Sequence, residues 1–505
     1  MPRNVETHWV RSFKGYTDSF LPGESSVMTD DLNNVKTRFG RIFGRGGMTK
    51  WNSVSTASSA AIIGLFNYRR AAGTHRMVRL LPTAVEEYTS GWNVITGTAL
   101  TGTTTSQPHS TIIDDTLIFT NGVDLPRKYS GTGNTSSIAA GSSPFAKGCI
   151  SYLGFLFLTN VSDDGTFTDV FDGHRIARYS DDWDADWSLC ANNEITLDET
   201  PGAWVASVVL GRNLYGIKTD GIVQIRFTGG QLRFQQELLT SDVGCVAPLS
   251  VAKSGNGGAF FLGTDGVIYL LTDQGIKPVS TDRLWNTLPT TFSLARLKWA
   301  RGVVDSEDDT YYLFYDRTGL GTQLLDSYVS YNYLTGEIQK GTLGASVIAC
   351  SEFKPTDQEA EAILLSTTTL VEEFDSGSDD DGAALTRTWT TGWQPMGREL
   401  SRLHGVRVLA RKSGNARIKI DIATNYDPTF QFPQVFSLKG GAASDTRAEI
   451  TYHIPPQLCE VANVRIRLYH DTATATSEIQ AVGLEVSPSQ FPGFMADRGQ
   501  ANKAL

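Results

Sequence analysis

Cysteine is scarce in this chain of 505 residues, and its arrangement excludes two classes of protein. The five cysteines, Cys149, Cys190, Cys245, Cys350 and Cys459, are odd in number and lie far apart. They match neither a disulfide framework nor a zinc site, because zinc ligands are grouped in close pairs. We therefore expect reduced, mostly buried thiols in a protein that is made in a cytoplasm.

Long apolar runs and excess positive charge are also missing. No apolar run approaches the roughly 18 residues that a membrane span needs, so we expect no membrane span. The opening residues, MPRNVETHWVRSF, are polar and basic, unlike a secretory signal. Charged residues make up 19% of the chain and the net charge is −10, which argues against a dedicated duplex-binding protein.

The sequence carries none of the motifs H-E-x-x-H, G-x-S-x-G or G-x-x-x-x-G-K-[ST]. Gly44-Arg45-Gly46-Gly47 resembles a phosphate loop only in its glycines, and the seven histidines are scattered. The acidic segment 180–187 lacks the Gly and Glu positions of a calcium loop, so we expect a turn anchored by Trp183 and Trp187. We therefore predict no enzyme, no catalytic residue, no cofactor and no metal site.

Two central stretches, residues 214–229 and 261–275, read as copies of one another. In each, an apolar run is followed by Thr-Asp-Gly and then by an alternating run. The pairs Asp220-Gly221 and Asp265-Gly266 predict tight hairpin turns, because Gly accepts the positive φ that such turns need.

Similar stretches occur on both sides of this pair. They cover Met77–Gly91, Leu117–Gly131, Phe155–Ser180, Tyr311–Gly336 and Ile363–Gly377. The seven stretches begin 38 to 59 residues apart, and a period near 40–50 residues with strands in each unit is typical of a β-propeller. We predict six or seven blades.

The pattern changes after residue 385. Ile418, Ile420 and Ile422 alternate with polar residues, and similar alternation surrounds Val464 and Val406. Period-two alternation over at least four strands predicts a jelly-roll-like β-sandwich. The expected fold is therefore all-β, and the expected divisions are an N-terminal arm (1–50), a β-propeller (51–385), a β-sandwich (386–488) and a tail (489–505). The acidic run 379–382 is expected to be a solvated linker at the end of the propeller.

The first fifty residues do not look like a blade. Leu21-Pro22-Gly23 interrupts the chain, and residues 34–43 predict a short strand pair that turns at Gly40. Two interpretations remain open: an arm that docks on a partner, or an N-terminal strand that closes the propeller ring. The candidate partner-binding residues are Leu21, Pro22, Gly23, Arg38, Arg41 and Arg45.

The same segment contains Leu-Pro-Gly-Glu at 21–24, Asn34-Val35, Gly40-Arg41 and Arg45-x-Gly47. This set of motifs resembles the start of the tail hub proteins, also called nozzle or tail stabilisation proteins, of short-tailed bacteriophages. Further short motifs extend it over nearly the whole chain: Thr120–Pro126 with Lys128-Tyr129, Arg178–Asp181 with Trp187-Ser188, Ser241–Pro248, Phe260–Gly266, Trp389–Gly392 and Arg398–Leu409.

The resemblance implies a structural protein of the virion tail, assembled in the host cytoplasm. Members of that family form a homo-oligomeric ring, here expected to be a hexamer, below the portal and its adaptor. The ring continues the DNA ejection channel and anchors tail fibres or spikes, and genomic DNA is only transient cargo. Because a basic lumen would bind phosphates strongly, we expect a neutral or acidic lining that lets the duplex slide.

Three other functions stay open. A receptor- or glycan-binding tail protein would need a concave site with aromatic residues, for which Trp389 and Trp393 are the candidates. A component of a longer tail, in its tube or baseplate, could use the same blades. A propeller hydrolase would need several carboxylates and arginines that meet at the central axis.

Overall fold

The computed structural model forms two compact units, which we call the propeller unit (48–336 and 345–376) and the terminal unit (1–47, 337–344 and 377–505). The structure describes residues 5–17, 28–52, 54–56, 60–71, 75–165, 172–185, 187, 193–230, 233–281, 284, 294–317, 319, 323–356, 359–396, 401–412, 417–427, 429–437, 446–454, 460–470 and 477–488. In these ranges no helix has the length and apolar character that crossing a membrane requires.

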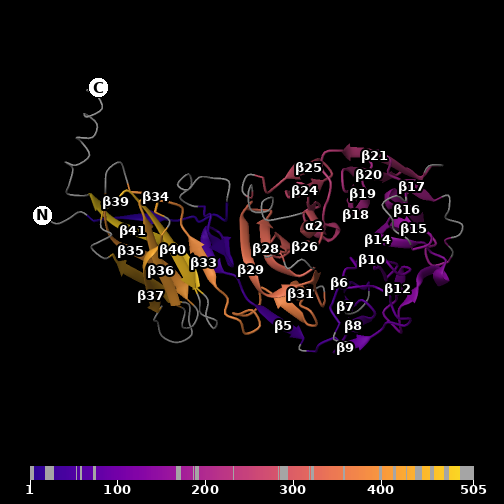
Figure 1. Cartoon of the computed structure of the whole chain (residues 1–505), viewed down its shortest axis with the longest axis horizontal. Coiled ribbons are helices and arrows are strands. Elements are labelled where there is room, and N and C mark those ends of the chain that lie inside the picture. The colour runs from indigo at the N-terminus through magenta and orange to yellow at the C-terminus, as the bar shows by residue number, and fades with distance from the viewer. Residues whose placement is uncertain are drawn as a thin grey trace, which may run out of the picture. The chain divides into compact units, whose positions relative to one another are not determined.

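Seven four-stranded antiparallel sheets make up the β-propeller (Figure 1). The first two sheets contain β6 (Gly64–Tyr68), β7 (Arg76–Leu80), β8 (Val85–Tyr88) and β9 (Trp92–Val94), then β10 (His109–Ile113), β11 (Thr116–Thr120), β12 (Arg127–Tyr129) and β13 (Ser136–Ser137). The third and fourth contain β14 (Phe145–Tyr152), β15 (Phe155–Ser162), β16 (Ile176–Ser180) and β17 (Glu194–Thr196), then β18 (Trp204–Leu210), β19 (Asn213–Lys218), β20 (Ile222–Phe227) and β21 (Phe234–Thr240).

The remaining three sheets follow the same strand order. They contain β22 (Ala252–Lys253), β23 (Ala259–Leu262), β24 (Ile268–Thr272) and β25 (Gly275–Pro278), then β26 (Arg301–Asp305), β27 (Thr310–Tyr315), β28 (Leu325–Asn332) and β29 (Ile338–Val347), and finally β30 (Ala349–Phe353), β31 (Ala362–Ser366), β32 (Val371–Phe374) and β5 (Met48–Asn52). The short helices are η1 (Ile138–Gly141), η2 (Asp172–Arg175), η4 (Pro248–Ser250) and α2 (Leu294–Leu297).

The N-terminal strand β5 closes the propeller. It pairs with β32, with Met48 opposite Phe374, and so supplies the fourth strand of a sheet whose other three strands come from residues 349–374. The innermost strands of neighbouring sheets touch around most of the ring, η4 contacts both β18 and β26, and β30 returns to contact β6. The interpretation of an N-terminal strand that closes the ring is thus confirmed for residues 48–52.

The predicted hairpins correspond to the second and third strands of the seven sheets, so the blade number is seven. The turn at Gly266 has the expected positive φ of 80°. Gly221 does not have a positive φ, so the prediction that this glycine is needed for a positive φ is wrong. A Cβ atom there would lie 2.8 Å from the carbonyl oxygen of Thr240, so close backbone approach requires the glycine.

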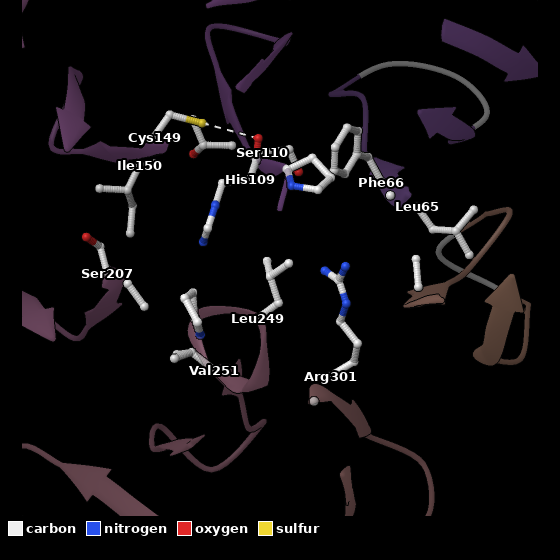
Figure 2. Close-up of a pocket in the computed structure, with 18 of the residues that line it drawn as sticks. Leu65, Phe66, His109, Ser110, Cys149, Ile150, Ser207, Leu249, Val251 and Arg301 are labelled. Atoms are coloured by element: carbon white, nitrogen blue, oxygen red, sulfur yellow. Dashed lines mark hydrogen bonds between the residues drawn. The ribbon is translucent and has the colours of Figure 1, made fainter. Parts of the chain in front are cut away.

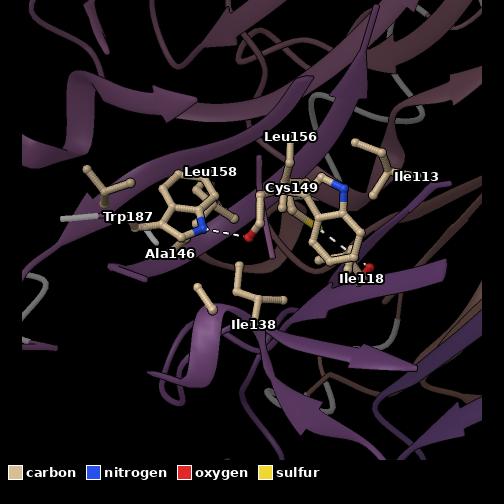
Figure 3. Packing of buried hydrophobic residues seen from close by; sticks show 11 residues of the cluster. Ile113, Ile118, Ile138, Ala146, Cys149, Leu156, Leu158 and Trp187 are labelled. Atoms are coloured by element: carbon tan, nitrogen blue, oxygen red, sulfur yellow. Dashed lines mark hydrogen bonds between the residues drawn. The ribbon is translucent and has the colours of Figure 1, made fainter. Parts of the chain in front are cut away.

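Apolar residues of the second and third sheets pack together between the blades (Figure 3). Ile118, Leu156, Trp183 and Trp187 all belong to this cluster. The Trp187 indole N–H donates a hydrogen bond of 2.8 Å to the Trp183 carbonyl, and the Trp183 indole N–H donates one of 3.2 Å to Asp114 Oδ2. The predicted tryptophan-anchored turn is confirmed.

The terminal unit contains the β-sandwich. One sheet has the order β3-β4-β41-β35-β38, with β1 on β41 and β39 on β35; the other has the order β2-β33-β40-β36-β37, with β34 on β40. The strands are β1 (Glu6–Val10), β2 (Leu32–Asn33), β3 (Val35–Arg38), β4 (Arg41–Gly44), β33 (Arg387–Thr390), β34 (Gln394–Pro395), β35 (Ser401–Lys412), β36 (Arg417–Thr424), β37 (Gln431–Ser437), β38 (Thr446–His453), β39 (Glu460–Val461), β40 (Asn463–His470) and β41 (Ser477–Pro488). The alternating residues Ile418, Ile420 and Ile422 are fully buried, as their period predicts.

The expected separation of residues 1–50 from the sandwich is not what the structure shows. Glu6 pairs with Val486, Leu32 with Trp389 and Ile42 with Ile479, so the N-terminal strands are part of both sandwich sheets. Pairing satisfies backbone groups that a sheet edge would leave open, which is the physical reason for their place. The unit boundaries fall at 47/48 and 376/377, with 337–344 also in the terminal unit. The expected tail, 489–505, lies outside the described residues.

Candidate functional site

The six candidate partner-binding residues fall into two groups. Leu21, Pro22 and Gly23 lie outside the described residues. Arg38, Arg41 and Arg45 are placed on or directly after the β3–β4 hairpin of the terminal unit. Their environments differ strongly, and the difference separates an exposed surface from a buried network.

The β3–β4 hairpin turns through two residues, as the sequence predicts. Arg38 is paired with Arg41, and the turn residues Phe39 and Gly40 have φ values of 52° and 70°. Two successive positive φ values are typical of the turn that matches the twist of paired strands. Gly40 is also required by space, because a Cβ atom there would lie 2.8 Å from Ser12 Cα.

The tip of this hairpin, residues 38–41, presents an apolar ring among cations. The Phe39 side chain is 83% exposed, and the Arg38 guanidinium carbon lies 5.6 Å from the ring centroid. Arg41 is about half exposed and forms an ion pair of 2.7 Å with Glu478. Aromatic and arginine side chains are enriched at protein–protein contacts, so this tip has the chemistry of a docking surface.

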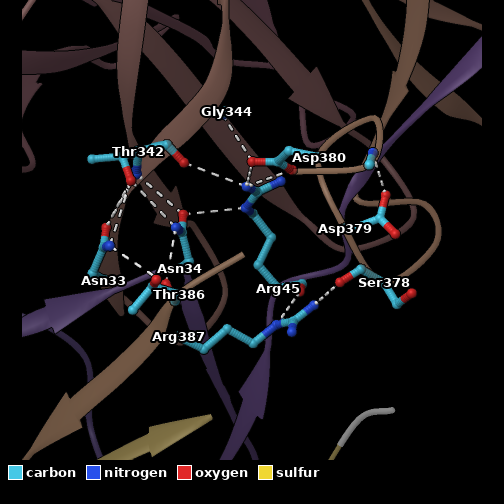
Figure 4. A network of polar contacts seen from close by, with 11 residues as sticks. Asn33, Asn34, Arg45, Thr342, Gly344, Ser378, Asp379, Asp380, Thr386 and Arg387 are labelled. Carbon is cyan, nitrogen blue, oxygen red and sulfur yellow. Dashed lines mark hydrogen bonds and ion pairs between the residues drawn. The ribbon is translucent and has the colours of Figure 1, made fainter. Parts of the chain in front are cut away.

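Arg45 has a different place, and its assignment as a partner-binding residue requires correction. Its side chain is fully buried and donates from Nη2 to both carboxylate oxygens of Asp380, at 3.0 and 2.9 Å (Figure 4). Its Nε donates to Asn34 Oδ1 at 3.3 Å. A buried guanidinium with these partners holds the fold together and does not reach a surface.

A wider set of contacts joins Arg45 to distant segments of the terminal unit. The Gly344 amide donates to Asp380 at 2.8 Å, and Arg387 donates to the carbonyl oxygens of Arg45 and Ser378 at 2.8 and 2.9 Å (Figure 4). A Cβ atom at Gly44 would lie 2.3 Å from Arg387 Cδ, which explains one glycine of the motif that resembles a phosphate loop.

The acidic run 379–382 is therefore not simply a solvated linker. Asp380 is buried, although the sequence shows only three adjacent aspartates that resemble a hydrated segment. No local signal distinguishes Asp380 from its neighbours, since its partner Arg45 lies 335 positions away. Sequence reasoning missed this residue for that reason.

A second candidate site lies in the centre of the propeller. A cavity of about 330 Å³ is lined by residues of the innermost strands of the sheets and of η4 (Figure 2). Its lining includes Arg301, His109, Cys149 and Cys350 but no aspartate or glutamate. The carboxylates that a propeller hydrolase would place at the axis are thus missing from the described lining.

Burial sets the charge state of this cavity. It lowers the pKa of Arg301 to about 10 and that of His109 to about 4, where the Arg301 charge acts in the same direction. It raises the pKa of the Cys149 and Cys350 thiols to about 12. At neutral pH the cavity therefore holds one cation, a neutral imidazole and two neutral thiols.

The aromatic pair proposed for glycan binding does not form an open platform. Trp389 and Trp393 are both buried in the terminal unit. Trp389 packs edge-on against Phe13 with ring centroids 4.7 Å apart, and Trp393 packs against Tyr426 at 5.1 Å. Neither ring presents a face on which a sugar could stack.

The described parts of the chain contain few residues suited to metal binding or thiol chemistry. No group of three or more His, Cys, Asp or Glu residues there could hold a metal ion. Cys149, Cys245 and Cys350 are free; the first two are buried and the third is partly exposed. Cys190 and Cys459 lie outside the described residues.

No family model matches this chain, and no curated protein matches it. Several solved structures align with it at low similarity. They include the WD40 domain of Pan2 from Neurospora crassa (8% identity, 66% of this chain and 95% of that chain, TM-score 0.37), BBS1N in complex with ARL6DN (10%, 65% and 96%, 0.37) and a fungal alcohol oxidase of the AA5 family in complex with copper (9%, 93% and 99%, 0.37). Similarities at this level carry no conclusion about function.

Proposed function

We propose that this protein is a structural subunit of a phage tail, a hub or nozzle ring below the portal and adaptor of a short-tailed bacteriophage. The observation that carries the proposal is the combination of a propeller closed by its own N-terminal strand β5 with a sandwich woven from both ends of the chain. Units whose terminal strands are paired within their own sheets are rigid, and rigidity suits a structural role more than a catalytic one.

The motifs behind the resemblance occupy structural positions, which supports the proposal. In the segment 120–126, the Asn121 side chain accepts hydrogen bonds from the Val123 and Asp124 amides at 3.0 and 2.8 Å. In the segment 260–266, Asp265 accepts a hydrogen bond of 2.6 Å from the Tyr269 hydroxyl. A family signature made of turn and packing residues is expected where the shared property is a scaffold.

The hairpin tip 38–41 is the proposed contact with another tail subunit or with the adaptor. A hexameric ring requires a heterologous contact, in which two different patches of identical subunits meet and the rotation closes. Phe39 supplies an exposed apolar anchor for such a contact, and Arg38 and Arg41 flank it. Tail fibres or spikes would bind other faces, and DNA would pass through the channel along a lining that is neutral or acidic overall.

Electron microscopy of the purified protein, together with immunolabelled virions, tests this function. We expect rings of one copy number in solution and label at the junction of head and tail. A protein that stays monomeric at tens of micromolar and is missing from purified particles would contradict the proposal. Label at the far end of a long tail would instead identify a tube or baseplate component.

A matched pair of variants tests the docking surface. Phe39→Asn removes the ring but tolerates the positive φ, so the hairpin should persist while rings dissociate into smaller species. Val435→Thr changes another exposed apolar residue of the same unit and should leave ring formation unchanged. Mass photometry of both variants measures the outcome, and equal ring populations would remove the hairpin from the interface.

A further inference from the structure

The central cavity of the propeller contains a buried arginine without a carboxylate partner. Arg301 is the first residue of β26, is only 5% exposed, and points its guanidinium into the cavity (Figure 2). The one hydrogen bond of this guanidinium within the described chain is a long one of 3.5 Å from Nη2 to the carbonyl oxygen of Ile63. Among the described residues that line the cavity, none is an Asp or Glu that could balance its charge.

This situation differs from that of another buried arginine of the same unit. Arg79 is also fully buried, and its Nε donates to Glu86 Oε2 at 2.7 Å. Its other nitrogens reach the carbonyl oxygens of Val54 and Ser55. A buried charge is costly unless it is paired and hydrogen-bonded, so Arg79 has the usual arrangement and Arg301 does not.

The neighbours of Arg301 add further hydrogen-bonding capacity to the cavity. Both ring nitrogens of His109 are buried; the backbone of Gln107 and Lys147 lies near the ring, but no well-aligned hydrogen bond forms within the described chain. Ser110 and Ser207 are also among the lining residues, and the Ser207 hydroxyl accepts a hydrogen bond of 2.9 Å from the Trp204 indole. A neutral imidazole offers one donor and one acceptor, and each hydroxyl offers a donor, so these groups could complete the shell around an anion.

Apolar residues form part of the remaining wall, while polar atoms make up the larger share of its exposed surface. Leu249 lies beside Arg301 in the view of Figure 2, and Leu65 and Phe66 also belong to buried clusters between the blades. Apolar walls lower the local dielectric and strengthen the attraction between the guanidinium and a negative group. A volume of about 330 Å³ lies at the small end of the range for ligand pockets.

We infer that this cavity binds a small molecule bearing an oxyanion, a carboxylate or a phosphate, with the Arg301 guanidinium as its principal partner. The planar fork of a guanidinium matches two oxygens of either group. His109 would donate a third hydrogen bond, and the apolar wall would cover a short hydrophobic body. The inference concerns the propeller alone and does not rest on the proposed place in a phage tail.

Isothermal titration calorimetry of the full-length protein tests the site with two probes, benzoate and inorganic phosphate, each against chloride at equal ionic strength. Arg301→Met removes the charge-assisted hydrogen bonds to the probe, so it should weaken binding by about 10- to 100-fold. Arg226→Met removes an exposed arginine of the same unit, which pairs with exposed Glu237, and should bind as the unaltered protein does. Arg301→Lys keeps the charge without the fork and should lie between the two.

The outcomes separate cleanly. Saturable binding of either probe that is lost in Arg301→Met supports the site, and preference for benzoate or phosphate identifies which oxyanion it takes. If Arg301→Met does not fold, the weaker binding of Arg301→Lys carries the same test. No saturable binding of either probe by the unaltered protein, or equal affinity in Arg301→Met, would overturn the inference.

Discussion

Two regions of this molecule each bury an arginine guanidinium, and they treat its charge differently. In the terminal unit, Arg45 meets both oxygens of Asp380. In the centre of the propeller, Arg301 meets no carboxylate of the described chain. In the first arrangement a carboxylate of the chain balances the charge, whereas in the second no carboxylate of the described residues does so.

The difference separates a buried charge that stabilises the fold through an ion pair from a buried charge that faces a cavity without a carboxylate partner. The propeller can complete a buried pair, since Arg79 and Glu86 do so within one hairpin. The open charge at Arg301 is therefore a feature of the cavity and not of the propeller in general. Buried, incompletely paired ionisable groups in a cavity are a recognised signal of a binding site.

The largest effect is expected from a substitution that removes the carboxylate partner of Arg45 and so makes Arg45 resemble Arg301. Asp380→Ala leaves a fully buried guanidinium without its carboxylate, and we expect a loss of about 3–5 kcal/mol from the local free energy of unfolding. Hydrogen exchange measured by mass spectrometry should show the loss in peptides that cover residues 35–47 and 378–390. Local exchange isolates this region without assuming that the whole chain unfolds in one step.

The neighbouring aspartate is the matched control. Asp379→Ala removes one exposed hydrogen bond, to the Gly382 amide, and should cost no more than about 1 kcal/mol. Equal effects of the two substitutions would show that the buried Arg45–Asp380 ion pair contributes no more to stability than the exposed hydrogen bond of Asp379.

Protonation of His109 would add a second positive charge to the cavity that contains Arg301, and this charge would also lack a carboxylate partner among the described lining residues. The folded-state pKa is about 4, below the ordinary 6.5, so the unfolded chain takes up a proton first as the pH falls. Stability is therefore complete above about pH 6.5, declines as the pH falls to about 4, and then levels off. A shift of this size corresponds to at most about 3 kcal/mol.

Urea unfolding followed at pH 7.5 and at pH 4.5 measures this effect. His109→Gln cannot be protonated, so it should lose less stability than the unaltered protein over this interval. His8→Gln changes an exposed histidine and should keep the full decline. An identical decline in His109→Gln would assign the pH dependence to other groups.

The sequence was sufficient for features set by neighbours along the chain. Thr-Asp-Gly turns located two hairpins, and weaker copies of the same apolar runs located the other five, because each hairpin joins strands that are adjacent in sequence. The apolar period of Ile418, Ile420 and Ile422 located the buried face of the sandwich for the same reason. Even there, the physical reason for Gly221 was not visible, since it depends on a carbonyl from the next strand.

Features set by distant residues could not be predicted. Arg41 and Arg45 look alike in sequence, yet one lies on a hairpin surface and the other inside a network completed by Asp380. Residues 6–10 join the sandwich only because residues 482–486 offer them an edge. The cavity around Arg301 needs the innermost strands of six sheets and η4 to meet, and no single strand signals it.

The smallest effect on stability is expected from the loss of the exposed ion pair between Arg41 and Glu478, which tests whether burial determines the cost. It joins the same chemical groups as the Arg45–Asp380 pair at 2.7 Å, but the Arg41 side chain is 47% exposed. We expect Arg41→Ala to cost less than about 1 kcal/mol in the same exchange measurement, with less difference at 0.5 M salt. A cost near that of Asp380→Ala would mean that partner identity, and not burial, governs these arginines. A small folding cost combined with loss of rings would place Arg41 at a subunit contact.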